Sequence, residues 1–207
     1  MKQSLNIVGY CHIKNHTISV NGQSVISKDS ELSFADFSKQ IYKEKQLTYP
    51  KFFKMDNLCK LAFLASEFLF QHSATDEITK ENMGIVLSNT SASLDTDRKY
   101  QDTIIDKENY FPSPAVFVYT LANIAIGEIS IRHQIKGENA FFVSENFNET
   151  LLEQYATSLI SNKKSSHILC GWVDFDGDNY HAFMYLVAKE GAFPHSKEFI
   201  KNIYNEN

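Results

Sequence analysis

Along the middle of the chain, apolar and polar positions follow either the spacing of a helix or the continuous run of a buried strand. Residues 56–71, "DNLCKLAFLASEFLFQ", carry apolar side chains over most of a helical circumference, and Asp56 can cap that helix. Residues 83–89, "MGIVLSN", form a continuous apolar run, which is typical of a parallel strand covered on both faces. Residues 111–137 open with two prolines and keep helical spacing until Gly137, which we expect to end the helix in a left-handed conformation.

β-prone runs occupy both ends of the chain, and turn signals separate them. These runs cover residues 6–13, 16–25, 166–175 and 180–190. An Asn-Gly pair divides the second run, and "DGDN" joins the last two. Strands that alternate with helices predict one α/β domain over residues 1–207. We expect a mixed, mainly parallel sheet that is covered by helices and ends in a C-terminal hairpin.

Residues 140–155 predict a buried strand, a short elbow and a helix. Enzymes that attack carbonyls often place a nucleophile at such an elbow, because the first N–H groups of the helix are unpaired and stabilise negative charge. This elbow carries Asn146 instead of Cys or Ser. Asn is also a good N-cap, and Glu149 follows three positions later as in a capping box, although Asn148 is an alternative cap. On spacing alone, a helix cap is the preferred interpretation.

Composition excludes several classes of protein. The chain is 43% hydrophobic and 22% charged, which is ordinary for a globular protein, and its formal charge of -5 disfavours nucleic acid as a partner. No apolar run is long enough for a membrane span or a secretory signal, so we expect a cytoplasmic protein. The three widely spaced cysteines argue against disulfides and a zinc site. The sequence has no P-loop and no dinucleotide fingerprint, and we expect no cofactor.

Two other candidate sites have structural explanations. The carboxylates of residues 174–179, "DFDGDN", lack the Gly and Glu that a calcium loop requires at its sixth and twelfth positions, so a hairpin turn is favoured. Cys170 and His167 are near each other in sequence, but nothing further supports a Cys–His hydrolase. Cys59 and Cys170 lie in apolar runs, and burial there makes a thiol inert.

Several segments, in order, resemble the N-terminal half of a β-ketoacyl-acyl-carrier-protein synthase of the thiolase fold. They are "FKMDNLCKLAFLASEFLF", "MGIVLSNTSASLDT", "FPSPAVFVYTLANIAIGEISIRHQIKGENAFFVSENF" and "ATSLISNKKSSHILCGWVD", within residues 53–174. The third is the most specific, because Asn123, Gly127, Ser130-Ile131 and Gly137-Glu138-Asn139 match the family's frame. The resemblance implies a thiolase-like half fold.

The resemblance also implies that the reaction centre has lost its nucleophile. The family's cysteine falls on Asn146, with Glu145 and Phe147 as neighbours, and an amide cannot attack a thioester. The family's two catalytic histidines and its lysine belong to a second half that has no match in this sequence. We therefore expect no catalysis by this chain alone.

A nucleophile-free chain of this kind resembles the chain-length-factor subunits of two-component synthases. The resemblance implies a heterodimer with a Cys-bearing β-ketoacyl synthase, in fatty-acid or polyketide-type biosynthesis of an aryl polyene or flexirubin. Acyl carrier protein would dock on the catalytic subunit, since both it and this chain are acidic. Expected interface and acyl-tunnel residues are Phe117, Tyr119, Leu121, Ile124, Phe141 and Phe142.

Two alternatives remain open at the level of sequence. The chain could be an active acyltransferase or malonyl-thioester decarboxylase, in which Asn146 donates a hydrogen bond to an enolate. It could also be a free-standing module that binds acyl chains or acyl carrier protein.

Overall fold

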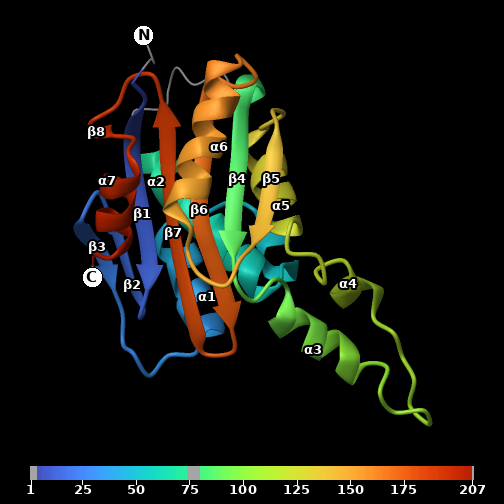
Figure 1. The fold of residues 1–207 in the computed structure, drawn as a ribbon. Helices are drawn as coiled ribbons and strands as arrows, with labels where there is room; N and C mark the ends of the chain where they lie inside the picture. The colour runs from blue at the N-terminus through green and yellow to red at the C-terminus, as the bar shows by residue number, and fades with distance from the viewer. Residues whose placement is uncertain (1–3, 74–79, 207) are drawn as a thin grey trace.

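An eight-stranded sheet forms the centre of the molecule (Figure 1). The computed structural model describes residues 4–73 and 80–206. The strand order is β3-β2-β1-β7-β6-β4-β5, and β8 pairs with β1. The strands are β1 (Asn6–Lys14), β2 (Thr17–Val20), β3 (Gln23–Ser27), β4 (Met83–Asn89), β5 (Asn139–Val143), β6 (His167–Asp176), β7 (Asn179–Ala188) and β8 (Phe193–Pro194).

Most strand pairs in this sheet are antiparallel. In the described part of the chain only β4 forms parallel pairs, with β5 on one side and β6 on the other. The predicted mixed α/β class and the C-terminal hairpin β6–β7 are confirmed, but the prediction that the sheet is mainly parallel was wrong. Hairpins join β1 to β2, β2 to β3 and β6 to β7, and strands joined by so short a turn must run antiparallel.

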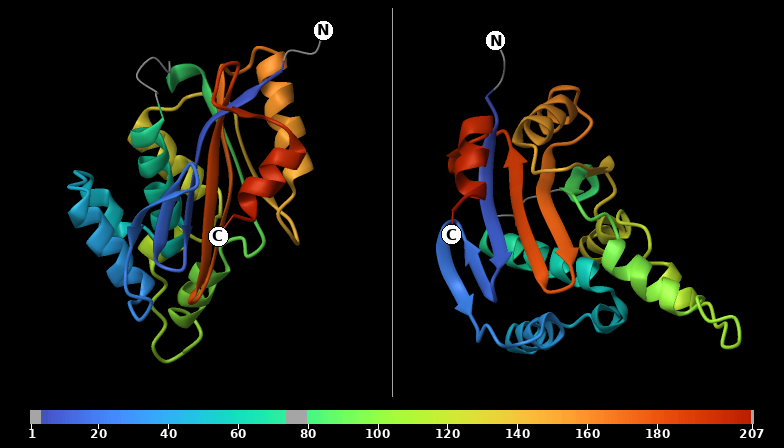
Figure 2. Two further views of the ribbon diagram at one scale, coloured as in Figure 1. Left: turned by 90° about the vertical axis from the view of Figure 1, so that its left-hand side faces the viewer. Right: turned by 60° about the horizontal axis from the view of Figure 1, so that its bottom comes forward.

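Helices cover both faces of the sheet (Figure 2). One face packs against α1 (Phe34–Glu44), α2 (Asn57–His72) and α5 (Ile124–His133). The other packs against α6 (Glu149–Ser161) and α7 (Lys197–Tyr204). The shorter helical segments are η1 (Pro50–Lys54), η2 (Lys80–Asn82), α3 (Leu94–Asp102) and α4 (Pro114–Phe117).

The two strongest sequence patterns form the elements that they predict. The whole of β4 is buried, as a strand between two helical layers requires. Asp56 caps α2 by accepting a hydrogen bond from the Cys59 N–H at 2.8 Å, and its other oxygen accepts one from Thr96 Oγ1 at 2.7 Å. Asp56 therefore also ties α2 to α3.

The predicted long helix over residues 111–137 is broken. It consists of α4 and α5, and α5 ends with Gln134 in the left-handed region at φ 58°, not with Gly137. Gly137 instead lies where the backbone passes close to β4. An added Cβ there would lie 2.3 Å from the Met83 carbonyl oxygen.

Residues 94–123, which we call the arm, project away from the sheet (Figure 1). The arm contains α3, α4 and the loop between them. Besides the Thr96–Asp56 hydrogen bond, its base is held where Tyr119 OH donates to Glu128 Oε1 at 3.1 Å and Ser93 Oγ donates to the Thr120 carbonyl at 2.8 Å. Large apolar side chains cover its outer surface, including Phe111, which is 77% exposed.

Candidate functional site

The predicted elbow lies between β5 and α6, against the turn that follows β4. The Ser144 N–H donates to the Asn89 carbonyl at 2.9 Å, and Thr90 Oγ1 donates to the Glu145 carbonyl at 3.3 Å. Ser144 Oγ donates to the Asn146 carbonyl at 2.9 Å. The elbow is therefore held at the carboxyl ends of two parallel strands.

The helix cap is Asn148 and not Asn146. The Asn148 side chain accepts a hydrogen bond from the Leu151 N–H at 2.9 Å, and α6 begins at Glu149. Asn146 is exposed and lies before the cap, so its preferred interpretation as a helix cap was wrong. The chain stays non-helical up to Asn148 because Phe147 turns inward against aromatic side chains.

This difference predicts unequal effects of two alanine substitutions. Asn148→Ala should lower the free energy of unfolding by about 1 kcal/mol, because it removes the cap of α6. Asn146→Ala should change it by less than about 0.5 kcal/mol, since its side chain is exposed. Urea unfolding of both variants measures the effects, and equal losses would show that Asn146 contributes to the start of the helix.

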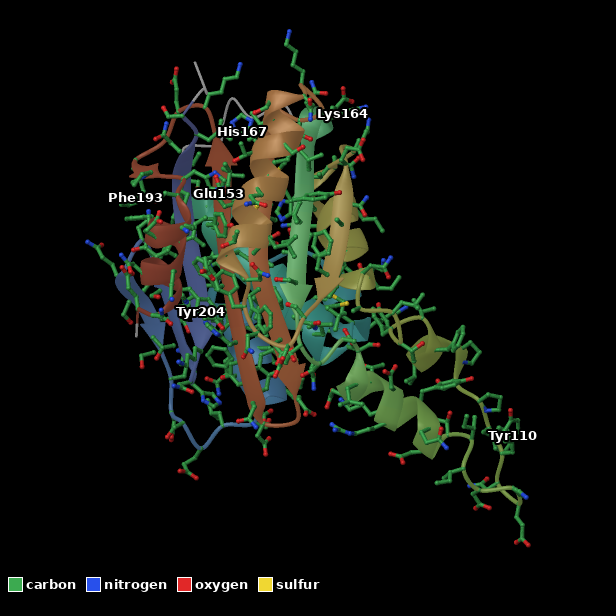
Figure 3. All side chains as sticks on the ribbon, in the orientation of Figure 1. Tyr110, Glu153, Lys164, His167, Phe193 and Tyr204 are labelled. Atoms are coloured by element: carbon green, nitrogen blue, oxygen red, sulfur yellow. The ribbon has the colours of Figure 1, made fainter. Side chains whose placement is uncertain are left out.

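Phe147 anchors the elbow to α7. Its ring stacks on Tyr204 with a centroid distance of 4.0 Å and meets Phe183 edge-on at 5.7 Å. Trp172 lies edge-on at 6.1 Å. Figure 3 labels Tyr204 at the end of α7, on the same face as α6. This partner of the elbow was not predicted from the sequence, because residues 193–207 were interpreted only as a polar end of the chain.

A pair of buried histidines lies beneath α7. His12 Nδ1 is 3.3 Å from His181 Nε2, and His12 Nε2 is 2.9 Å from the Ile203 carbonyl oxygen. A carbonyl can only accept, so His12 donates from Nε2 and accepts from His181 at Nδ1. Burial lowers the pKa of His12 to about 4 and that of His181 to about 3. Both rings are therefore neutral at pH 7.

These lowered pKa values predict that acid destabilises the folded chain. Below a pH of about 6.5 the unfolded chain binds protons that the folded chain does not, so stability should fall as the pH drops towards 4. We expect each histidine to account for about 2 kcal/mol of loss between pH 7 and 4.5. In urea unfolding across this range, His12→Phe should reduce the total loss of unfolding free energy by about that amount. An unchanged slope would mean that His12 titrates normally in the folded chain.

A cavity of about 550 Å³ opens beside Tyr204, at the carboxyl end of β6. Its lining includes Trp172, Asp174, Tyr180 and His181. The Asp174 carboxylate already accepts hydrogen bonds from the N–H groups of Thr90 and Ser91, at 3.1 and 2.8 Å. Asp174 thus holds the turn after β4 in place.

The predicted hairpin turn at residues 174–179 is confirmed. β6 ends at Asp176, β7 begins at Asn179, and Gly177 between them has a φ of 61°. Over residues 4–73 and 80–206, no group of three or more His, Cys, Asp or Glu side chains is arranged to hold a metal ion.

None of the three cysteines lies at the elbow. Cys11, Cys59 and Cys170 are all buried, and burial raises the pKa of each thiol well above its usual value. They lie on β1, α2 and β6, whereas the elbow follows β5. The prediction that Cys59 and Cys170 are core residues is confirmed.

The predicted interface residues divide into an exposed and an inward-facing group. Phe117 and Leu121 are 56% and 58% exposed on the arm, whereas Tyr119 is buried and Ile124 packs against the core. Phe141 and Phe142 are half-buried on β5. Phe141 packs towards the layer of α2, and Phe142 meets Tyr155 of α6 edge-on at 5.3 Å.

β5 is an edge strand. Among the described residues it pairs only with β4, so its outer side presents unpaired backbone groups. Val143 at its end is 59% exposed. The edge strand is at the same side of the sheet as the arm (Figure 1). A backbone edge and an apolar surface are thus both open to a partner.

No family model matches the sequence, and no curated protein is similar enough to match. Solved structures do match. The ishigamide ketosynthase/chain length factor has a TM-score of 0.68 at 18% identity, over 89% of this chain and 62% of that chain. A ketosynthase (ApeO) in complex with its chain length factor (ApeC) from Xenorhabdus doucetiae has a TM-score of 0.61 at 13% identity, over 91% of this chain and 80% of that chain.

A β-ketoacyl synthase from Burkholderia phymatum STM815 has a TM-score of 0.63 at 12% identity, over 98% of this chain and 61% of that chain. The chain thus spans less than two thirds of the length of two of these three proteins. Within the described residues, no helix is long and apolar enough to cross a membrane.

The similarity to these three solved structures shows that the chain has the thiolase-like fold of ketosynthases and chain length factors.

Proposed function

We propose that this chain is a non-catalytic, ketosynthase-like subunit that pairs with a Cys-bearing β-ketoacyl synthase. It would stabilise that enzyme and shape the tunnel for the growing acyl chain. The observation that carries the proposal is the elbow: a strand and a helix are joined there by a turn that carries Asn146 and no cysteine. We assign this turn to the position that the nucleophile has in a catalytic synthase.

The surroundings of Asn146 do not favour catalysis by this chain. A hydrogen bond to an enolate is most effective in a site that excludes water. Asn146 is exposed, and the inner side of the elbow is filled by the stacked rings of Phe147 and Tyr204. These features support a vestigial role for Asn146 and its neighbours Glu145 and Phe147.

The exposed surfaces of the chain support a partner. β5 offers unpaired backbone groups, and the neighbouring arm carries Phe111, Phe117 and Leu121 on its outside. Exposed large apolar side chains that gather on one element favour an interaction site. We place the synthase against β5 and the arm, with Phe117 and Leu121 at the contact and Phe141, Phe142, Tyr119 and Ile124 behind it.

The similar structures support a biosynthetic role. One is the ishigamide ketosynthase/chain length factor, and another is a ketosynthase in complex with its chain length factor. We propose a related role here, in fatty-acid or polyketide-type biosynthesis of an aryl polyene or flexirubin. The net charge of -5 favours docking of the acidic carrier protein on the catalytic subunit.

Purification of the tagged chain from its native organism tests this proposal. We expect a stoichiometric companion, identified by mass spectrometry as a synthase with an intact active-site cysteine. The isolated chain should not turn over malonyl thioesters. A monomer without a companion, or malonyl turnover that Asn146→Ala abolishes, would contradict the proposal.

A further inference from the structure

The cavity of about 550 Å³ beside Tyr204 lies where the strands extend past the helices on this face of the sheet. α7 ends at Tyr204, and the lower ends of β6 and β7 continue beyond it (Figure 1). Lys14, His181 and Asp174 are register partners on the neighbouring strands β1, β7 and β6, and all three line the cavity. Adjacent strands are about 4.8 Å apart, so these side chains form a row about 10 Å long.

The hydrogen-bond role of each side chain in this row is fixed. The ammonium group of Lys14 can only donate. His181 donates from Nε2 to His12, so its Nδ1 carries a lone pair, and in the described part of the chain no group donates to that atom. The Asp174 carboxylate already accepts three hydrogen bonds from the turn after β4, which leaves one of its about four acceptor positions open.

Two further polar groups in the lining have no partner. Trp172 is 5% exposed, and among the described residues its indole N–H has no acceptor. The Tyr204 hydroxyl also lacks a partner there, and burial and the nearby charge of Asp174 raise its pKa. Neither group is fully enclosed, in contrast to the Tyr185 hydroxyl. A ligand in the cavity can therefore reach both groups.

The charges of the lining do not favour a charged ligand. Within the described chain, Lys14, Asp174 and Asp178 line the cavity, so both signs are present. Lys14 and Asp178 are exposed, where an ion pair contributes little, and Asp174 already accepts three hydrogen bonds. A hydroxyl group both donates and accepts, so it matches every position of the row. The rings of Trp172 and Tyr180 add apolar surface beside these polar groups.

We propose that this cavity binds a neutral sugar of one or two rings. Its hydroxyl groups would donate to His181 Nδ1 and to the free position of Asp174. Others would accept from Lys14 and from the Trp172 N–H, and the C–H face of the ring would lie against an aromatic side chain. The volume of about 550 Å³ is sufficient for such a ligand. β4 separates this row from the edge strand β5, so the site does not depend on the proposed synthase partner.

The chain has a single tryptophan, so its fluorescence reports directly on this cavity. The fluorescence of Trp172 is measured while the full chain is titrated with glucose and with maltose, and saturation-transfer NMR of the sugar is the second readout. We expect a saturable change with at least one of the two sugars. No saturable change in either readout would overturn the proposal.

Charged sugars of the same ring size test the neutral class. Glucosamine carries an ammonium group and glucuronate a carboxylate at a pH of about 6.5. We expect both to bind more weakly than glucose or maltose. Tighter binding of glucosamine would indicate a site for cations, and tighter binding of glucuronate a site for anions; either result would overturn the proposal.

Matched variants place the sugar in this cavity. Tyr204→Phe keeps the ring on Phe147 but removes the hydroxyl, and it should weaken binding roughly threefold to tenfold. Tyr155→Phe removes a hydroxyl from α6, outside the cavity, and should leave binding unchanged.

Lys14→Met should weaken binding by a similar factor, because it removes the donor of the row. Lys39→Met removes an exposed lysine from α1 and should have no effect. Equal binding by each variant and its control would overturn the proposal, once circular dichroism shows that all four are folded.

Discussion

Replacing Phe111, Phe117 and Leu121 by serine should remove the ketosynthase from the purified complex. These side chains are 77%, 56% and 58% exposed, so their apolar area is available to a partner. Buried aromatic anchors often contribute about 2 kcal/mol or more each to binding, and we expect the affinity to fall at least about 100-fold. Co-purification of the tagged triple variant with the synthase measures the loss.

The same triple variant should remain folded, because exposed side chains contribute little to the core. Val25→Ser is the matched control: it removes an exposed apolar side chain from β3, at the other edge of the sheet. Its complex should be intact. Retention of the synthase by the triple variant would show that the arm is not the contact surface.

Glu67→Gln should strongly destabilise the isolated chain, because it disrupts a buried ion pair between two helices. Glu67 lies on α2 and is 6% exposed. Arg132 of α5 donates to its two oxygens at 2.6 and 3.2 Å, and His133 Nε2 is 3.2 Å from Oε1. Burial alone would raise the pKa of Glu67, but the adjacent His133 and the hydrogen bonds from Arg132 outweigh it and lower that pKa to about 2.

The substitution leaves the guanidinium of Arg132 without its counter-charge, and we expect a loss of about 3 kcal/mol in the free energy of unfolding. Glu81→Gln is the matched control, since Glu81 pairs with Lys136 at an exposed position. It should have no measurable effect in urea unfolding. Similar losses in both variants would contradict a special role for the buried pair.

The sequence predicts elements well where one periodicity governs a whole segment. The helix α2 and the strand β4 are of this kind, because their apolar patterns match a single buried environment. The elbow was also predictable, since a short apolar and aromatic run gives way to helical spacing within a few positions.

Contacts between distant segments explain the errors. The cap of α6 is Asn148 and not the predicted Asn146, because Phe147 stacks on Tyr204 instead of entering the helix. No local sequence pattern indicates this contact. Gly137 marks a close approach to Met83 rather than the end of a helix.

One missed element did carry a local signal. α7 is capped by Ser196, and its buried side chains Ile200 and Ile203 lie three positions apart, as on one face of a helix. This pattern predicts an amphipathic helix that covers the sheet.

Hydrogen exchange of the complex between the tagged chain and its co-purified synthase tests the central claim most directly. We predict that the outward-facing amide groups of β5, residues 139–143, and the arm exchange more slowly in the complex than in the isolated chain. The β3 edge should exchange at the same rate in both. Protection at β3, or unchanged exchange along β5 and the arm, would contradict a subunit that pairs with the synthase through this edge.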